Sequence, residues 1–311
     1  MTFKQLTDVD KELIRVSYRR EDSKSKAQNQ LASTFGVTTR TVRQWAQNLG
    51  LTGDNTTTDS FRVMIYDIET SRVNAKVWWT GKQFVGHKNL TSEPKMISVS
   101  WKWLGEDKIH ALTWDKDHCD KAMIEKFMVE YNSADMIVGQ NNDRFDNRWL
   151  NARAMKHGIH FNTFIKSFDI MKQTKRLFRL PSYSMDYITK FLNVENKQTH
   201  EGIKMWDMIQ EGTKAQQKEY LQKMVDYNVG DIVSTEAMYI TLRKYMGHKV
   251  HFGVLGGLPK WTSPSDGTTD VFLYRTTCTA NGTIQRIMQS NTDGVQYKIS
   301  NREYMKFFNA Q

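Results

Sequence analysis

The sequence predicts an α/β protein with a mixed sheet flanked by helices, an all-α segment before it and a small β-rich segment after it. Three observations lead to this class. The first sixty residues place apolar side chains at helical spacing. The middle of the chain alternates short apolar runs with helical periods, and the last sixty residues hold short apolar runs separated by glycine-rich turns.

The composition indicates a folded protein with an anionic partner. Of 311 residues, 39% are hydrophobic and 25% are charged, which excludes global disorder. The net charge is +10, and residues 61–250 hold 29 basic and 23 acidic side chains. Two cysteines exclude a disulfide framework and a four-cysteine zinc site. No apolar run reaches membrane-spanning length and no signal peptide begins the chain, so we expect a cytoplasmic protein that binds nucleic acid.

We expect four parts along the chain. Residues 1–51 form the helical part, and residues 52–60 form a flexible linker because they are polar and lack an apolar period. Residues 61–250 form the α/β part. Residues 251–311 form the β-rich tail, since glycines and a proline interrupt the pattern near residue 253.

The helical part contains a helix-turn-helix pattern. Helices are expected at about 8–20, 26–34 and 38–48. Small Ala32 lets two helices cross, Gly36 supplies a tight turn, and Val42 and Trp45 pin the second helix. The segment resembles the helix-turn-helix family over about 20 residues, which implies DNA contacts from the exposed side chains Thr39, Arg40, Arg43, Gln44 and Gln47. A three-helix bundle for protein contacts is the alternative.

Two carboxylates end the first strand of the α/β part. Asp67 and Glu69 follow the apolar run 61–66, and residues two apart share a strand face, so both project together. Such a pair suits divalent cations, although acid-x-acid pairs also arise by chance.

The elements that follow strengthen the prediction. Strands at 96–103 and 108–114, a helix at about 118–131, a strand at 136–138 and a further helix follow in turn. Three strands, helix, strand and helix is the order of a ribonuclease H-like core. In that core, Asp146 at the strand-to-helix junction reaches the same corner as Asp67.

A late helix at about 214–246 completes a motif set. It carries Tyr227 and Asp231, four residues apart and therefore on one face. The ordered set resembles the 3′–5′ exonucleases that use four carboxylates and a tyrosine, over about residues 61–246. Residues 66–70 resemble the first motif of proofreading domains in family B DNA polymerases, and residues 168–169 and 180–187 resemble the connecting helices of the family.

The resemblance implies a mechanism. Asp67, Glu69, Asp146 and Asp231 bind two Mg²⁺ or Mn²⁺ ions, and Tyr227 aims the attacking water. Further residues are expected to contact the nucleic acid: Thr70, Asn141 and Phe145 at the terminal nucleotide, and Lys172, Lys175, Arg176 and Arg179 along the strand, unless these four form a solvated basic face.

The substrate implied is DNA, with single-stranded or frayed 3′ ends favoured and RNA not excluded. Because the chain has no room for a polymerase domain, it looks like a stand-alone, phage-type exonuclease, working in the cytoplasm of a bacterium or a phage-infected cell. It would act alone or with a replication or polymerase partner in trans.

Two other functions remain to be separated. A transposase or integrase also joins a helix-turn-helix to a ribonuclease H-like core, but usually has one carboxylate on the first strand and a late glutamate. A DNA-binding regulator on an inactive nuclease fold is the second alternative, and the intact set of carboxylates argues against it.

The tail contains a repeated pattern without cysteines. Ser263 to Gly267 reads Ser-Pro-Ser-Asp-Gly, and Ser290 to Gly294 reads Ser-Asn-Thr-Asp-Gly. With cysteines in place of serine and aspartate, the pair would resemble a zinc ribbon. A ribbon that has lost its metal and two ordinary turns are both open interpretations, and zinc is not expected in either.

Overall fold

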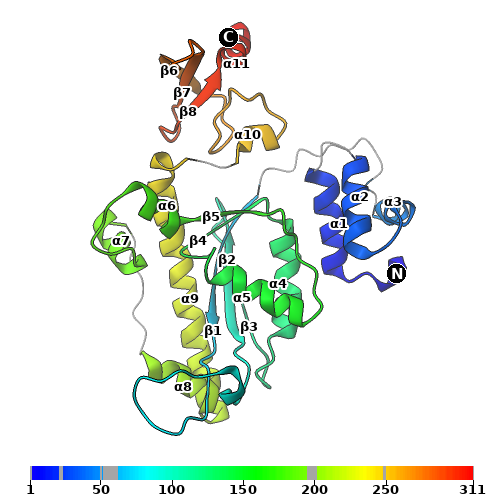
Figure 1. Ribbon diagram of the computed structural model, residues 1–311, viewed down its shortest axis with the longest axis vertical. Helices are drawn as coiled ribbons and strands as arrows, with labels where there is room; N and C mark the ends of the chain where they lie inside the picture. The colour runs from blue at the N-terminus through cyan, green and yellow to red at the C-terminus, as the bar shows by residue number, and fades with distance from the viewer. Residues whose placement is uncertain are drawn as a thin grey trace.

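The computed structural model describes residues 2–20, 24–49, 51, 62–194, 202–247 and 250–310 (Figure 1). The expected linker, residues 52–60, lies outside the described residues. A five-stranded sheet lies at the centre, with strand order β3-β2-β1-β4-β5. Its strands are β1 (Val63–Thr70), β2 (Met96–Trp103), β3 (Ile109–Thr113), β4 (Met136–Gly139) and β5 (Lys166–Asp169).

The sheet is mixed, with β1 in its middle. β1 and β2 pair antiparallel, as do β2 and β3, whereas β1–β4 and β4–β5 pair parallel. Parallel β1 and β4 therefore end at the same edge, from which the chain enters the following loops. The predicted α/β class, with its mixed sheet and flanking helices, is confirmed.

One sequence prediction was wrong. Residues 168–169 were assigned to a connecting helix, but they end strand β5, which pairs with β4 through Val138 and Phe168. The helix α6 (Ile170–Leu177) begins only afterwards, because the Asp169 side chain accepts a hydrogen bond from the Lys172 amide and caps it.

Helices cover both faces of the sheet. The long helix α9 (Lys214–Leu242) lies on one face, and α4 (Lys121–Ser133) and α5 (Asp146–Lys156) lie on the other. Along β1, Met64 and Tyr66 pack with the α4 residues, whereas Val63 and Ile65 pack with the α9 residues. This alternation fixes which β1 side chains face α9.

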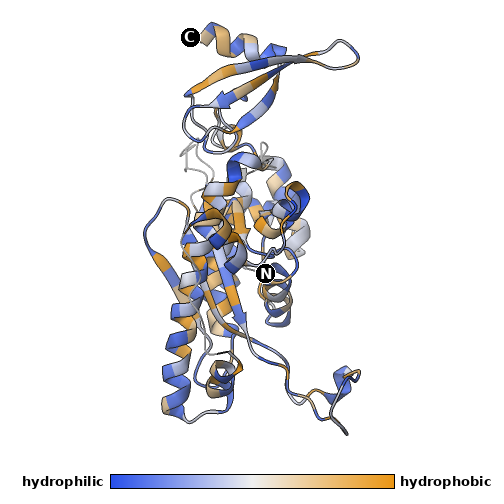
Figure 2. Ribbon diagram, turned by 90° about the vertical axis from the view of Figure 1, so that its left-hand side faces the viewer, coloured by the Kyte–Doolittle hydropathy of each residue, from blue (hydrophilic) through white to orange (hydrophobic). Residues whose placement is uncertain are grey.

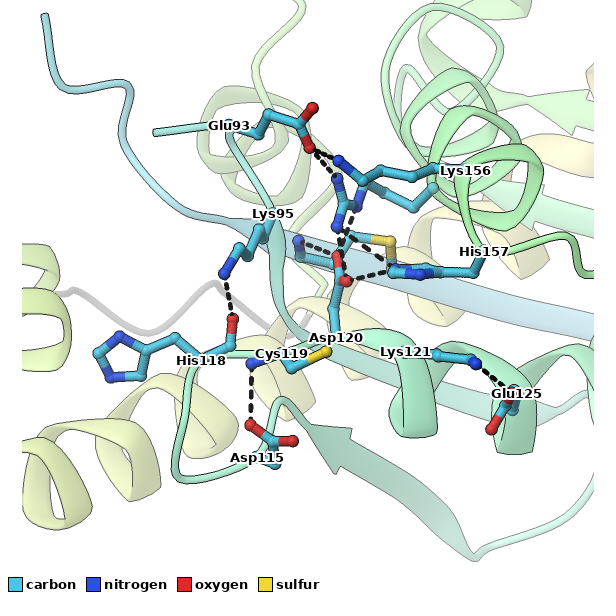
Figure 3. A network of polar contacts seen from close by, with 12 residues as sticks. Glu93, Lys95, Asp115, His118, Cys119, Asp120, Lys121, Glu125, Lys156 and His157 are labelled. Atoms are coloured by element: carbon cyan, nitrogen blue, oxygen red, sulfur yellow. Dashed lines mark hydrogen bonds and ion pairs between the residues drawn. The ribbon is translucent and has the colours of Figure 1, made fainter. Parts of the chain in front are cut away.

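A buried ion-pair network ties α5 to the start of β2 (Figure 3). The carboxylate of Asp120 is fully buried. It accepts hydrogen bonds from Arg153 Nε at 2.7 Å, from His157 Nε2 at 2.8 Å and from the Met96 amide at 3.0 Å. Burial alone would raise the pKa of Asp120, but the hydrogen bonds from Arg153 and His157 outweigh it and hold the pKa below its ordinary value.

The N-terminal helices pack against the α/β part. These helices are η1 (Phe3–Gln5), α1 (Asp8–Arg20), α2 (Lys24–Phe35) and α3 (Thr39–Asn48). Gly36 has the positive φ of +61° expected for the turn between α2 and α3, and Thr38 caps α3 by accepting from the Thr41 amide. Helix α1 lies against α4, and Val9 belongs to the core beneath α4. The Phe35 ring also contacts His160 at 5.2 Å between centroids.

The C-terminal tail is a second, three-stranded antiparallel sheet of order β6-β7-β8, with a helix against it. The β-rich tail that the sequence predicts is confirmed, and the helix against its sheet was not foreseen. The elements are α10 (Phe252–Leu255), β6 (Val271–Cys278), β7 (Ile284–Ser290), β8 (Gln296–Ser300) and α11 (Asn301–Ala310).

The repeated turns of the tail meet each other. Ser265 Oγ donates to Asp293 Oδ2 at 2.6 Å, which joins the two turns. Gly267 and Gly294 donate backbone bonds to Ser263 and Ser290, respectively, and both glycines have positive φ. Hydrogen bonds among serine and aspartate side chains thus connect the positions that metal ligands would take in a zinc ribbon.

The remaining elements include α7 (Met185–Leu192), α8 (Ile203–Glu211) and η3 (Arg243–Tyr245), which all contact α9. The short helix η2 (His87–Asn89) lies in the segment between β1 and β2. The segment between β1 and β2 extends away from the body near α8 (Figures 1 and 2). Among the described residues, the helices are too short or too polar to cross a membrane.

Candidate active site

Strand β1 places two carboxylates on the sheet face that α9 covers. Asp67 and Glu69 have the same parity as Val63 and Ile65, which pack with Ile232 of α9. The burial pattern of β1 becomes less buried toward its end, so both carboxylates lie where the core gives way to solvent. The sequence prediction that the pair shares one face is therefore consistent with the packing of the strand.

Helix α9 brings a third carboxylate to this pair. Asp67, Glu69 and Asp231 each offer a carboxylate oxygen, and these oxygens lie within 4.8 Å of one another. Asn228, one helical turn before Asp231, is fully buried and donates from Nδ2 to Asp67 Oδ2 at 2.6 Å. Asn228 therefore fixes the orientation of Asp67. A set of closely spaced carboxylate oxygens fits hard divalent cations such as Mg²⁺ and Mn²⁺.

Asp146 reaches the same place from the other side of β1. It is the first residue of α5, it is 3% exposed, and its Oδ1 accepts from the Ile68 amide at 3.1 Å. Ile68 stands between Asp67 and Glu69, so this bond places Asp146 beside the pair. Burial raises the pKa of Asp146 to about 7, and the neighbouring carboxylates of Asp169 and Asp231 act in the same direction.

The conformation of the loop after β4 positions Asp146 at the start of α5. A side chain at Gly139 would meet Asn142 Cβ at 2.7 Å, so only glycine fits there. Asn141 takes the left-handed conformation with φ of +67°, which asparagine tolerates better than most residues. The Asp169 carboxylate at the end of β5 accepts from the amides of Asn141 and Asp143 at 3.2 and 3.3 Å, and so holds the loop.

Tyr227 lies at a boundary along α9. Its side chain is 6% exposed and packs in a cluster with Ile97 and Met224. The next residue, Asn228, bonds to Asp67, and Asp231 follows one turn after Tyr227. Tyr227 is thus the last aromatic side chain before the polar part of the helix, and it stays a predicted catalytic residue.

The nucleotide contacts expected near the site are spread over two elements. Thr70 ends β1, and its carbonyl accepts from Trp206 Nε1 at 3.0 Å. Phe145, immediately before Asp146, is 39% exposed and packs near Trp149. Asn141 lines a basic cavity, and its carbonyl accepts from the amide of Phe145 at 3.1 Å, directly before Asp146.

This basic cavity has a volume of about 620 Å³. Its lining residues come from the loop after β4 and from α5, β5 and α6: Asn141, Asp143, Arg144, Arg148, Asp169, Met171, Lys172, Lys175 and Arg176. Three of the four basic residues expected along the strand are in this set. Arg179 instead lines a mostly apolar hollow between α6, α7 and the end of α9.

The five residues expected to contact DNA all lie on the exposed side of α3. These residues are Thr39, Arg40, Arg43, Gln44 and Gln47. On the opposite side, Val42 and Trp45 are buried in the core of the three helices. Arg43 also lies near α2, where Nη2 is 3.5 Å from Gln28 Oε1.

Two residues that organise the site, Asn228 and Asp169, were not assigned to it from the sequence. Asn228 precedes Asp231 by three positions, a spacing that puts both on one helical face, so that signal was available. Asp169 gave no such signal, because its partners Asn141 and Asp143 lie on a different loop.

Comparison with known proteins gives the following similarities. A family model for the RNase H superfamily matches residues 87–243, about half of the chain. Among solved structures, the chain is similar to a family B DNA polymerase from the hyperthermophilic archaeon Pyrobaculum calidifontis, with a TM-score of 0.44 and 15% identity. That similarity covers 63% of this chain and 26% of the polymerase, so the chain spans about a quarter of its length. A search of curated proteins gave no match.

Proposed function

Because the chain belongs to the RNase H superfamily, we propose that it is a metal-dependent 3′–5′ exonuclease that removes nucleotides from the 3′ ends of DNA. The observation that carries this proposal is the convergence of carboxylates at the end of β1. Asp67, Glu69 and Asp231 place oxygens within 4.8 Å of one another. Asp146 joins them through the amide between the first two.

The four carboxylates form a donor set that fits divalent metal ions. Four carboxylates at one place repel each other, and burial raises the pKa of Asp146 to about 7. Cations offset this cost, and oxygen ligands are the ones that Mg²⁺ and Mn²⁺ prefer. Asp67, Glu69, Asp146 and Asp231 would therefore hold two such ions. When bound, two ions lower the pKa of the attacking water and stabilise charge on the leaving 3′ oxygen.

The remaining residues of the site position the reaction. Asn228 holds the Asp67 carboxylate in one orientation by its 2.6 Å bond. We assign to Tyr227 a hydrogen bond to the attacking water, because a phenol donates and accepts while staying neutral near pH 7. Thr70, Asn141 and Phe145 would contact the terminal nucleotide, with the exposed Phe145 ring available for stacking on a base.

The basic cavity supports a path for the strand that carries the 3′ end. Arg144, Arg148, Lys175 and Arg176 gather there. Their positive charges would contact phosphates one or more nucleotides from the cleaved bond. Single-stranded or frayed ends are favoured, because a base that stacks on Phe145 must first leave its partner.

The N-terminal helices are proposed to bind duplex DNA through α3. The packing of α1 on α4 holds them against the nuclease part, which would place the duplex at a fixed distance from the carboxylates. Replacing Arg40 and Arg43 by glutamine should lower duplex affinity and make its salt dependence shallower, while digestion of single strands continues. Undiminished duplex affinity would instead assign these helices to protein contacts.

The proposal is tested by digestion of 5′-labelled DNA with Mg²⁺ or Mn²⁺. We expect wild-type protein to produce a ladder that shortens from the 3′ end, and Asp67→Ala to produce none. Asp107→Ala, an exposed carboxylate on the turn between β2 and β3, is the matched control and should digest normally. Single-stranded DNA, duplex DNA and RNA in parallel reactions establish the substrate.

Two outcomes would contradict the proposal. Equal digestion by the Asp67→Ala protein would remove the carboxylates from the reaction. Joining of labelled donor ends to a target, without stepwise shortening, would indicate a transposase or integrase instead.

A Tyr227→Phe protein should digest DNA roughly 10- to 100-fold more slowly, because one hydrogen bond to a charged group contributes about that much. Tyr220→Phe, on the same face of α9, is the control and should digest at the wild-type rate.

A further inference from the structure

The loop between β1 and β2 exposes an unusual set of aromatic side chains. We define the aromatic loop as residues 71–92. At its tip, Trp78 is 92% exposed, Trp79 is 64% exposed and Phe84 is 95% exposed. Three large aromatic side chains this exposed within seven residues mark an interaction site on a protein surface.

The aromatic loop has a closed stem. Ala75 and Leu90 form a bridge between the two legs, and the Lys76 amide donates to the Asn89 carbonyl at 2.9 Å. At the tip, Gly81 has a φ of +108°, a conformation that favours glycine. Because the stem holds the two legs together, less conformational entropy is lost when the aromatic rings bind a ligand.

The base of the loop is anchored to α8. The Arg72 guanidinium pairs with Asp207, and its backbone amide donates to Gln210 Oε1 at 2.9 Å. The Ser71 amide donates to the Lys95 carbonyl at 2.8 Å, which closes the base against β2. The loop therefore starts from a fixed point directly after Thr70, at the same end of β1 as the carboxylates.

The charge of the loop indicates what it binds. Residues 71–92 contain one arginine and three lysines, with neither aspartate nor glutamate. Lys76, Lys82 and Lys88 are all exposed. Lys76 and Lys88 line a hollow of about 680 Å³ together with Trp78. Aromatic rings interleaved with cations and free of acids suit a polyanion that offers flat, stackable groups.

From these observations we infer that the aromatic loop binds single-stranded nucleic acid, stacking bases on Trp78, Trp79 and Phe84 and pairing phosphates with the lysines. Single strands fit better than a duplex, because paired bases hide their faces from stacking. As an outer grip on the strand whose 3′ end is digested, the loop rests on the proposed function. Its binding of single strands does not.

The test measures binding without digestion. The probe is a fluorescein-labelled oligothymidylate of about 16 nucleotides, in EDTA, followed by anisotropy. The triple variant Trp78→Ala, Trp79→Ala, Phe84→Ala should lose at least about tenfold in affinity, since one base–aromatic stack is worth roughly that much. Phe308→Ala on α11, 61% exposed, is the matched control and should bind as wild type does.

A second variant tests the cations. Lys76→Gln, Lys82→Gln, Lys88→Gln should weaken binding and make the slope of log affinity against log salt shallower by about 2, as expected for three phosphate contacts to a single strand. Both triple variants change exposed side chains only, so their thermal unfolding should match that of the wild type.

The outcomes separate this inference from the proposed exonuclease. If the aromatic variant binds more weakly than the wild type, and the wild type digests no DNA, the inference about the aromatic loop is supported and the proposed exonuclease is contradicted. Wild-type affinity in that variant, with digestion intact, overturns the inference. If the aromatic variant binds with wild-type affinity but loses a self-associated form that light scattering detects in the wild type, the inference is also overturned. The rings would then be assigned to a contact between protein chains.

Discussion

Asp120 and Asp146 are buried carboxylates at opposite ends of α5, and their surroundings shift their pKa values in opposite directions. Asp120 contacts the last turn of α5, where Arg153 and His157 donate to it (Figure 3). Asp146 begins α5, where a backbone amide donates to it and other carboxylates surround it. The pKa of Asp120 is lowered, whereas burial raises the pKa of Asp146 to about 7.

The difference separates a carboxylate that is paired within the chain from one that lies among other carboxylates. The Asp120 charge is balanced by side chains of the chain itself, so the pair joins α5 to β2. The Asp146 carboxylate lies beside those of Asp67, Glu69 and Asp231, and in the proposed function bound metal ions balance these charges. One end of α5 is thus fixed by ion pairs, and the other end carries a carboxylate that the proposed function assigns to metal binding.

The largest expected effect is on activity. Replacing Asp146 by asparagine keeps its shape and removes its charge. We expect metal-dependent digestion to fall at least about 1,000-fold, as when one member of a cooperating catalytic set is lost. The melting temperature in EDTA should not fall, because the change removes a buried charge. A variant that digests at the wild-type rate would make Asp146 a structural residue like Asp120.

The next effect is on stability. Replacing Asp120 by asparagine leaves Arg153 buried without its carboxylate, at an expected cost of about 3–5 kcal/mol in the free energy of unfolding. Urea denaturation measures this cost. Glu125→Gln, in the exposed pair with Lys121 on α4, is the matched control and should cost less than about 1 kcal/mol. Similar midpoints for the two variants would contradict the structural role of Asp120.

The smallest effect is the pH dependence of the metal-free protein. A lowered pKa means that Asp120 stabilises the fold above its unfolded pKa of about 4, and that this contribution is lost as the pH falls through the folded pKa. A raised pKa means that Asp146 stabilises the fold at low pH, and that this contribution is lost between about pH 4 and 7.

The two asparagine variants should therefore change the pH profile in opposite ways. In EDTA, Asp146→Asn should flatten the decline of stability from pH 4 to 7, and Asp120→Asn should flatten its decline toward acid. Urea midpoints measured from pH 7 down to well below pH 4 follow both effects. Parallel profiles would show that the two carboxylates do not differ in environment.

The sequence was most informative where the signal was local. Asp67 and Glu69 share a face because strand side chains alternate, and Tyr227 and Asp231 share one because of the helical period. Strand β5 was missed because four residues with two polar ends carry no alternation, and it forms only through pairing with β4. The Asp120 network joins residues more than twenty positions apart, so no spacing rule finds it.

The aromatic loop illustrates a further limit. Its residues gave no periodic pattern, so the sequence did not indicate whether Trp78 and Phe84 are buried or exposed. Their exposure follows from the stem at Ala75 and Leu90, which turns the tip away from the sheet. Long-range contacts, and not local periodicity, therefore determine the exposure of these side chains.

The most direct test of the central claim is calorimetric titration of the protein with Mn²⁺. We predict two ions per chain for the wild type, and the same for Glu125→Gln. Asp146→Asn should lose one ion or bind it at least about tenfold more weakly, because one of four carboxylate ligands is gone. Unchanged stoichiometry and affinity in Asp146→Asn would contradict the account.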